Sequence, residues 1–400
     1  MTFTALLAAA GVLIVSPAGP YRTITEALER AAPGDRIVVR AGTYREPLLR
    51  ITKRLELIGE GGPVLIGGAH GVIEILADSV TVRGLVIQGV EPSPLEDRAG
   101  IRIREAGACR IEDNVFRDTF FAVYAEQARD CAVLRNRIVG PSRKGIGSGN
   151  GIHLWRSVRM RIEGNDVSGH RDGMYLEFSP HAVLRGNTST GNARYGLHFM
   201  RSDTCRYERN RFERNGAGVA VMYSRGVRMT ENRFERNWGS AAYGLLLKDI
   251  SDGEIRDNQF IRNTVGLYLE DSNRNQVSGN TFAGNGWAIK VMANATENRF
   301  AANQFQGNTF DVATNSQTAS SSFEGNWWDR YRGYDLDRDG RGDVPFRPVR
   351  LFSLIMEQHE PSVILLRSAF VDLLDAAERV LPVLTPAGLV DARPLMGRPR

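Results

Sequence analysis

Hydrophobic and polar residues alternate with a period of two over short segments along most of the chain, which is typical of half-buried β-strands. One unit of the pattern contains "CRYERN", "RFERN" and "GVAVMY", three alternating segments separated by Asn and Gly turn residues. Three parallel strands that close on a repeat form one coil of a solenoid. The pattern therefore predicts an all-β fold, a right-handed parallel β-helix with three strands per coil of about 22 residues.

Asparagine marks the repeat, because it recurs two positions before an apolar residue at nearly constant intervals. These asparagines are Asn114, Asn136, Asn165, Asn187, Asn210, Asn232, Asn258, Asn280, Asn303 and Asn326. Glycines followed by apolar residues one and three positions later keep step with them, at Gly100, Gly151, Gly173, Gly196, Gly218, Gly244 and Gly266. Stacked coils would place the asparagine amides in a ladder that satisfies backbone groups at the turns.

The composition changes at both ends of the repeat and divides the chain into four parts. The apolar run in residues 1–18 predicts a signal peptide cleaved near Ala18, although no Lys or Arg precedes the run and a buried first strand is the alternative. Residues 19–326 form the β-helix, with an amphipathic helix at 22–32 as its cap. An Asp-rich capping loop follows at 327–350, and residues 351–400 form a helical tail that either caps the last coil or docks a partner.

Three insertions interrupt the repeat, at residues 91–99, 140–149 and 237–243. Each comes just before a glycine-led strand, so all three are expected to overhang the same edge of the helix. We expect the face that they border to bind a partner.

The strand "GLHFMR" (residues 196–201) carries the candidate site. Core residues alternate with His198 and Met200, which are predicted to point outward, and Met222 is expected one coil along from Met200. Imidazole and thioether groups form a soft ligand set that favours Cu(I). His153, two coils away, is a candidate relay ligand for copper. The alternative is an apolar surface that a partner covers.

A second hypothesis treats the same face as the groove of a polysaccharide lyase, hydrolase or epimerase. Asp172 and Glu177 would be the paired carboxylates, and Trp155, Tyr175 and Tyr268 would bind sugar rings. For hydrolysis the two carboxyl groups should stand about 5 to 9.5 Å apart.

The segment "YDLDRDGRGDVP" places Asp335, Asp337, Asp339 and Asp343 at the spacing of a calcium loop. Phe346 stands where the usual bidentate Glu would be. Calcium binding is one interpretation, and an Asp-rich turn held by its own backbone bonds is the other.

The remaining composition excludes some classes of protein. The formal net charge is +5, but arginine is spread along the chain and interleaved with Asp and Glu, which indicates a solvated surface and no nucleic-acid partner. Of the three cysteines, Cys109 and Cys131 are predicted to lie in adjacent coils, either as buried fillers or as a disulfide.

The segment "GNWWDRYRGYDLDRDGRGDVPFRP" (325–348), which follows the asparagine-marked coils and an "APGDRIVVRAGTY" entry, resembles the NosD family. That resemblance covers almost the whole mature chain. It implies a periplasmic β-helix protein that helps an ABC transporter, made of an ATPase and a permease, to assemble the copper-sulfide site of nitrous oxide reductase.

The implied role is copper or sulfur delivery, with a copper donor chaperone as a further partner and membrane association only through the transporter. We expect no enzymatic activity, and the chain has no GxxxxGK[ST] phosphate loop, so any ATP-driven step must come from a partner. A purely structural interaction scaffold remains a third hypothesis.

Overall fold

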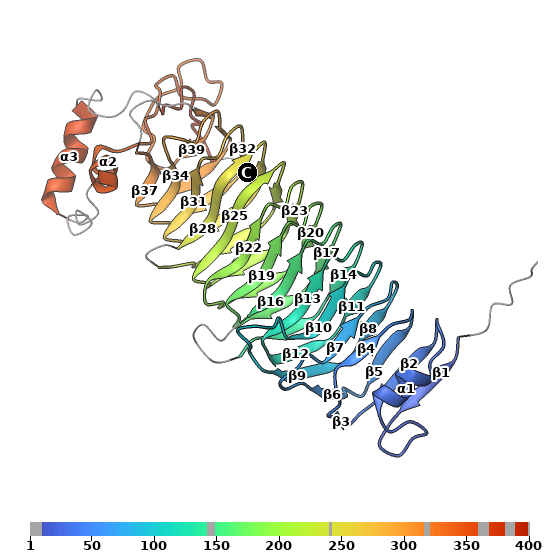
Figure 1. Cartoon of the computed structure of the whole chain (residues 1–400). Helices are drawn as coiled ribbons and strands as arrows, with labels where there is room; N and C mark the ends of the chain where they lie inside the picture. Colours follow the sequence, from blue (N-terminus) through green and yellow to red (C-terminus); the bar gives the residue numbers. More distant parts are fainter. Residues whose placement is uncertain are drawn as a thin grey trace, which may run out of the picture. The chain divides into compact units, whose positions relative to one another are not determined.

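The computed structural model describes residues 10–141, 149–239, 242–315, 321–358, 368–380 and 389–398. It divides into two units, residues 1–183 (the N-terminal unit) and residues 184–400 (the C-terminal unit). In each unit, stacked coils contribute one strand to each of three parallel sheets, which we name A, B and C (Figure 1). The predicted all-β parallel β-helix with three strands per coil is confirmed.

The strands of the N-terminal unit are short. Sheet A holds β1 (Val12–Val15), β2 (Arg36–Arg40), β5 (Glu56–Glu60), β8 (Thr81–Arg83), β11 (Arg110–Glu112), β14 (Ala132–Leu134) and β17 (Arg161–Glu163). Sheet B holds β3 (Thr43–Tyr44), β6 (Val64–Ile66), β9 (Val86–Val90), β12 (Val115–Thr119), β15 (Arg137–Val139) and β18 (Asp166–Ser168). Sheet C holds β4 (Leu49–Ile51), β7 (Ile73–Ile75), β10 (Ala99–Arg104), β13 (Phe121–Glu126), β16 (Asn150–Trp155) and β19 (Asp172–Glu177).

The C-terminal unit repeats this arrangement. Sheet A holds β20 (Val183–Arg185), β23 (Arg206–Glu208), β26 (Arg228–Thr230), β29 (Glu254–Arg256), β32 (Gln276–Ser278), β35 (Arg299–Ala301) and β38 (Ser322–Glu324). Sheet B holds β21 (Thr188–Thr190), β24 (Arg211–Glu213), β27 (Arg233–Glu235), β30 (Gln259–Ile261), β33 (Thr281–Ala283), β36 (Gln304–Gln306) and β39 (Trp327–Trp328). Sheet C holds β22 (Tyr195–Met200), β25 (Ala217–Arg225), β28 (Tyr243–Ser251), β31 (Val265–Glu270), β34 (Trp287–Val291) and β37 (Phe310–Ala313).

In the C-terminal unit, the apolar residues that stand two positions after the repeat asparagines form the core. In sheet B these residues stack ring on ring: Phe212 lies 5.5 Å from Phe234, which lies 4.7 Å from Phe260. The stack ends at Trp328, 4.0 Å from Phe305. Because equivalent positions pair in register, each ring packs on the same side chain type in the next coil.

The predicted asparagine ladder is present in both units. Asn210 shows the pattern, since its backbone amide and side-chain amide both donate to Oδ1 of Asn232, at 3.0 and 2.9 Å. The sequence did not predict a second ladder, which runs along the corner between sheets B and C. It comprises Asn192, Asn215, Asn237, Asn263, Asn285 and Asn308. Two ladders therefore satisfy buried polar groups at two corners of the coil.

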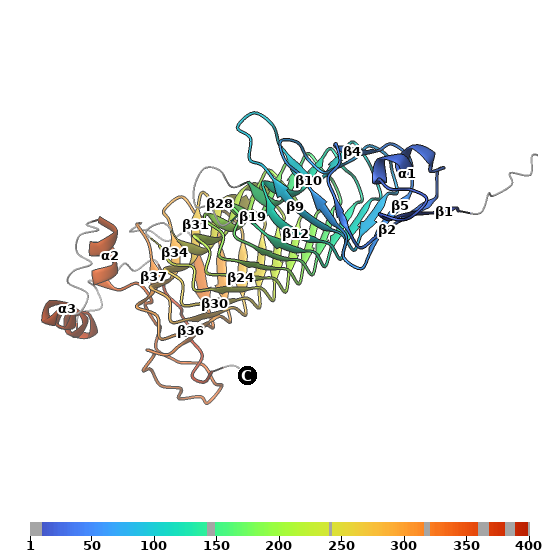
Figure 2. The ribbon, with the colours of Figure 1, turned by 90° about the horizontal axis from the view of Figure 1, so that it is seen from below.

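The first coil is capped by α1 (Ile24–Arg30), as predicted, and Figure 2 shows this helix beside the first strands. Thr23 and Glu26 form a capping box at its start. Val12–Val15, which precede the predicted boundary near Ala18, form β1, which pairs with β2. Cleavage near Ala18 would remove this strand, so the alternative of a first strand holds for these residues, and the signal peptide stays a prediction.

The predicted tail at 351–400 contains two helices, α2 (Leu351–Gln358) and α3 (Ala369–Val380). Phe352 and Met356 of α2 pack with Val371 of α3 against Phe310 of β37. Residues 389–398 are not part of the helices: Asp391 pairs with Phe346, and Leu395 bonds to Asn326. This part of the tail therefore caps the last coil.

Candidate functional site

The predicted cluster lies on the outer face of sheet C in the C-terminal unit. In Figure 1, β22 and β25 run side by side, and their register pairs Met200 with Met222 and His198 with Ala220. Both methionines are half-buried. Neighbouring strands lie about 4.8 Å apart, and an unbranched thioether side chain has three rotatable bonds. The two sulfur atoms can therefore converge on one soft ion.

His198 is more enclosed than the sequence suggested, with only 6% of its surface exposed. The ring centroid of Tyr195 lies 4.9 Å away, and Nη2 of Arg194 lies 3.2 Å from Nδ1 of His198. A guanidinium group only donates, so Nδ1 accepts, and in the neutral ring Nε2 then carries the proton. In this arrangement neither ring nitrogen offers a lone pair to a metal, so ligation by His198 requires Arg194 to move.

Charged side chains lie beside the two methionines of the cluster. The guanidinium of Arg201 lies 5.9 Å from the ring centroid of Tyr223. Lys248 pairs in register with Met222, but its ammonium group lies 3.3 Å from a carboxylate oxygen of Glu270, which raises the pKa of Lys248. This ammonium group is thus held toward Glu270, in the next coil away from Met200.

His153 belongs to the N-terminal unit and packs between aromatic rings. The ring centroids of Tyr124 and Tyr175 each lie 4.8 Å from it. Burial, with a smaller effect of the Arg171 guanidinium, lowers the pKa of His153 to about 3. The imidazole is therefore neutral at physiological pH, but rings cover it, and its role as a relay ligand stays a prediction.

The two carboxylates of the polysaccharide hypothesis do not form a catalytic pair. The side chain of Asp172 is fully buried and lies 3.8 Å from Nε of Arg171. Glu177 stands at the other end of β19 and accepts a 3.3 Å hydrogen bond from Tyr175. Five residues of strand separate the carboxylates by about 16 Å, which exceeds the spacing of glycosidase carboxyl groups.

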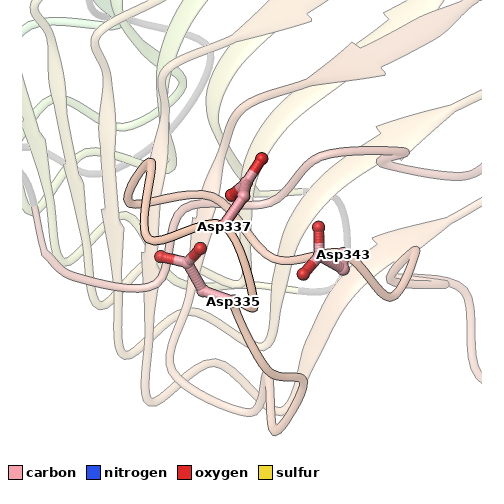
Figure 3. Close-up of side chains that lie close together, drawn as sticks. All are labelled: Asp335, Asp337 and Asp343. Carbon is pink, nitrogen blue, oxygen red and sulfur yellow. The ribbon is translucent and has the colours of Figure 1, made fainter.

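Three of the four predicted calcium-loop aspartates come together. Figure 3 shows Asp335, Asp337 and Asp343 around one loop, with carboxylate oxygens within 4.8 Å of one another. Asp339 instead forms an ion pair with Arg393. Asp335 accepts bonds from the backbone amides of Asp339 and Gly340, at 3.2 and 2.9 Å. These bonds match an Asp-rich turn, and calcium binding stays a prediction.

The cysteines face the core and are buried. Cys109 and Cys131 do lie in adjacent coils, since the Cys109 amide donates to Sγ of Cys131 at 3.2 Å. Both are free thiols in the structure, as is Cys205, so the hypothesised disulfide is not formed there.

Two residues beside His198 were not predicted from the sequence. Arg194 and Tyr195 precede the glycine of their strand, at the corner where the chain turns into sheet C. Tyr195 and Tyr243 each directly precede the glycine of their strand, and this recurrence could have indicated an aromatic edge there. Of the predicted insertions, 140–149 lies mostly outside the described residues.

The insertion at 91–99 does border a hollow, in the N-terminal unit. Its volume is about 450 Å³, and Arg98 of the insertion lines it together with Arg50, Glu74 and Arg104 of sheet C. Arg104 and Arg50 both pair with Glu74, at 2.8 and 3.2 Å. The charged groups of this wall are thus already paired with one another.

Fold and site together define a class of protein: a parallel β-helix with a soft-ligand cluster on an outer sheet face and no paired catalytic carboxylates at the positions tested. Solved structures show the fold alone. The A-module of a mannuronan C-5 epimerase from Azotobacter vinelandii covers 76% of this chain and 92% of its own, with 16% identity and a TM-score of 0.57. DFA-IIIase from Arthrobacter chlorophenolicus covers 74% and 95%, with 16% identity and a TM-score of 0.60.

The chain belongs to the NosD family. A family model described as "Periplasmic copper-binding protein (NosD)" matches residues 142–333. A Pseudomonas aeruginosa protein named "Probable ABC transporter binding protein NosD" is 31% identical over 457 residues, with 98% of this chain and 99% of that protein covered. A protein of the same name from Stutzerimonas stutzeri is 29% identical over 414 residues, with 90% and 86% covered.

Proposed function

We propose that this chain is a periplasmic accessory protein that holds Cu(I) at Met200, Met222 and His198 and passes it on during assembly of the copper-sulfide site of nitrous oxide reductase. The in-register pairing of Met200 with Met222, with His198 on the same face, carries this proposal. Family membership supports it, since the family description names copper and the relatives' names refer to an ABC transporter.

Copper is cargo in this proposal, and the site suits transient binding. Two half-buried thioether groups bind Cu(I) without deprotonation, and thioether ligands select Cu(I) over Zn(II) or Ca(II). His198 is held back by Arg194, so the first contact with copper would fall to the methionines. An ion held by few ligands can be released to an acceptor.

The same face supports a non-enzymatic role. Asp172 is buried beneath the sheet surface and cannot reach a polymer, and its distance from Glu177 does not suit hydrolysis. Uronate or oligosaccharide release from polysaccharides would contradict this part of the proposal.

Docking to the transporter is assigned to α3. Val371 is buried against the α2 cluster, whereas Phe370 and Leu373 are 48% and 67% exposed. Residues three apart on a helix share a face, so α3 is anchored on one side and presents large apolar side chains on another. No helix among the described residues is long and apolar enough to cross a membrane. In this proposal, membrane association comes through the transporter permease.

Native mass spectrometry of protein loaded anaerobically with Cu(I) tests the copper site. The double variant Met200→Leu/Met222→Leu keeps side-chain volume but removes both thioether groups. We expect the wild type to hold one Cu(I) and the double variant to bind it at least about tenfold more weakly, a change of about 1.4 kcal/mol. Met292→Leu, at a half-buried methionine outside the cluster, is the matched control and should bind as the wild type does.

Two outcomes would contradict the copper proposal: a wild type that binds no Cu(I), or a double variant that binds it equally well. The docking role is tested separately by capture of the permease-ATPase complex in detergent. Phe370→Ser/Leu373→Ser should reduce capture while leaving Cu(I) binding unchanged, because neither residue belongs to the cluster.

A further inference from the structure

Sheet B of the C-terminal unit carries a concentrated positive patch on three successive coils. Strands β24 and β30 are labelled in Figure 2, and β27 pairs with both. We name the arginine patch by its members, Arg211, Arg214, Arg233, Arg236 and Arg262. Two carboxylates, Glu213 and Glu235, belong to these strands and the corners that follow them, so these positions carry an excess of three positive charges, while Glu231 and Asp257 lie at the corners before β27 and β30.

The two carboxylates lie beneath the guanidinium groups. The side chains of Glu213 and Glu235 are 6% and 7% exposed, whereas those of Arg214 and Arg236 are 59% and 43% exposed. Glu213 is held by Arg211 at 2.6 Å and Arg214 at 2.8 Å. The two buried carboxylates thus hold guanidinium groups that are themselves partly exposed.

Like charges stack on one another in the patch. Arg211 pairs in register with Arg233, and Arg214, Arg236 and Arg262 follow in-register positions at the corner. Like charges directly opposite on neighbouring strands are destabilising. Arg211 and Arg236 each reach the carboxylate of the neighbouring coil only at longer range, 3.5 Å from Glu235 and 3.6 Å from Glu213.

The patch ends abruptly on both sides. In the preceding coil, Thr188 and Thr190 pair with Arg211 and Glu213. In the following coil, Thr281 and Ala283 pair with Gln259 and Ile261. The basic surface is therefore about three coils, or 10 Å, long. That length is small for contact with a membrane surface and suits one secondary-structure element of a protein.

We propose that the arginine patch is a docking surface for an acidic α-helix of a partner protein. Coils repeat every 4.8 Å or so, and carboxylates at positions i and i+4 of a helix stand about 5–6 Å apart. Positions i and i+7 span about 10 Å along the helix axis, which is the length of the Arg214, Arg236 and Arg262 column. The bound helix would offset the repulsion within the patch through charge-assisted hydrogen bonds.

Fluorescence anisotropy with a labelled synthetic helix tests the proposal. The probe carries glutamates at i, i+4 and i+7, and a second peptide has the same residues in an order that scatters the glutamates around the helix. We expect the wild type to bind the first peptide in preference to the second, with an affinity that falls as salt rises.

The triple variant Arg214→Gln/Arg236→Gln/Arg262→Gln should bind the first peptide at least about tenfold more weakly. Arg211 and Arg233, which pair with the buried Glu213 and Glu235 at 2.6 and 2.7 Å, are unchanged in this variant, so we expect the fold to be retained. The control Arg256→Gln/Arg274→Gln/Arg299→Gln removes the same charge from sheet A and its corners in the same unit.

Equal weakening in the control would show an effect of net charge alone and would overturn the proposal. So would unchanged binding in the patch variant, or binding of the wild type to phosphatidylglycerol vesicles without binding to the peptide. Thermal melting of each variant confirms that binding is compared between folded proteins. None of these outcomes depends on whether the unit binds copper.

Discussion

The carboxylate of Asp391 takes the place of an asparagine above Asn326. Its Oδ2 accepts from the backbone amide of Asn326 at 2.8 Å and from the side-chain amide at 3.0 Å, the same two bonds that each asparagine receives from the next. Oδ2 also accepts from the indole of Trp328, and Oδ1 accepts from the backbone amide of Gly325. A residue 65 positions later thus completes the ladder of the last coil.

Replacement of Asp391 should loosen the last coil. Asp391→Ala leaves several buried donors without an acceptor, at a cost of about 1–3 kcal/mol. Asp391→Asn keeps an acceptor oxygen and should cost less. Amide hydrogen exchange at residues 325–328 measures the effect, with exchange in the first coils of the unit as the internal control. Unchanged protection at 325–328 in the alanine variant would show that other contacts close the ladder.

Removal of Arg194 should strengthen copper binding. Arg194→Ala frees Nδ1 of His198 from its 3.2 Å contact, so the ring can offer a lone pair to Cu(I). We expect about tenfold tighter binding in competition with a chromophoric Cu(I) chelator. X-ray absorption should show a nitrogen ligand in this variant that His198→Ala/Arg194→Ala lacks. If Arg194→Ala binds like the wild type, Arg194 does not restrain the site.

Stability should fall as pH rises toward the raised pKa of Asp311. Burial raises this pKa from 3.8 to about 6, with partial opposition from Arg330. The folded state therefore holds the proton more tightly than the unfolded state, so stability is greatest below about pH 4 for this group and declines between pH 4 and 6. The full cost is on the order of 3 kcal/mol at neutral pH.

Asp311→Asn removes this titration and keeps the oxygen that accepts from Asn308. We expect the variant to melt at a higher temperature than the wild type at neutral pH and at a similar temperature near pH 4. A difference that does not change with pH would mean that Asp311 does not titrate in this range.

Calcium, if it binds, should act at the Asp-rich turn. Ca(II) would join the carboxylates of Asp335, Asp337 and Asp343, which lie within 4.8 Å of one another, and raise the melting temperature. Asp337→Asn should weaken the heat signal in isothermal titration, whereas Asp339→Asn, at the aspartate paired with Arg393, should not. No heat signal with the wild type would leave the turn as a purely structural element.

Any export signal should end before Gly11. The Gly11 amide donates to Asp35 at 2.7 Å, and β1 pairs with β2 over four residues. N-terminal sequencing of exported protein should therefore find Val12–Val15 retained. A mature chain that begins after Ala18 would show that β1 is dispensable.

Several features were determined by the sequence alone, because a short repeat is a local property. The spacing of asparagines and glycines fixes where each coil begins, and alternation fixes which side chains face the core. In-register stacking then follows, so the pairing of Met200 with Met222 could be predicted from column positions. The capping helix near Ile24 was also readable, from the amphipathic pattern of residues 22–32.

Other features were decided only by the tertiary structure, because they join residues whose positions the repeat does not relate. No periodicity links Asp391 to Asn326, and nothing local to β22 shows that Arg194 turns back onto His198. Burial of Asp172 depends on how the corner of the coil closes. The arginine patch could not be recognised from the charges counted along the chain, because arginine alternates there with Asp and Glu. It forms only where successive coils bring arginines side by side.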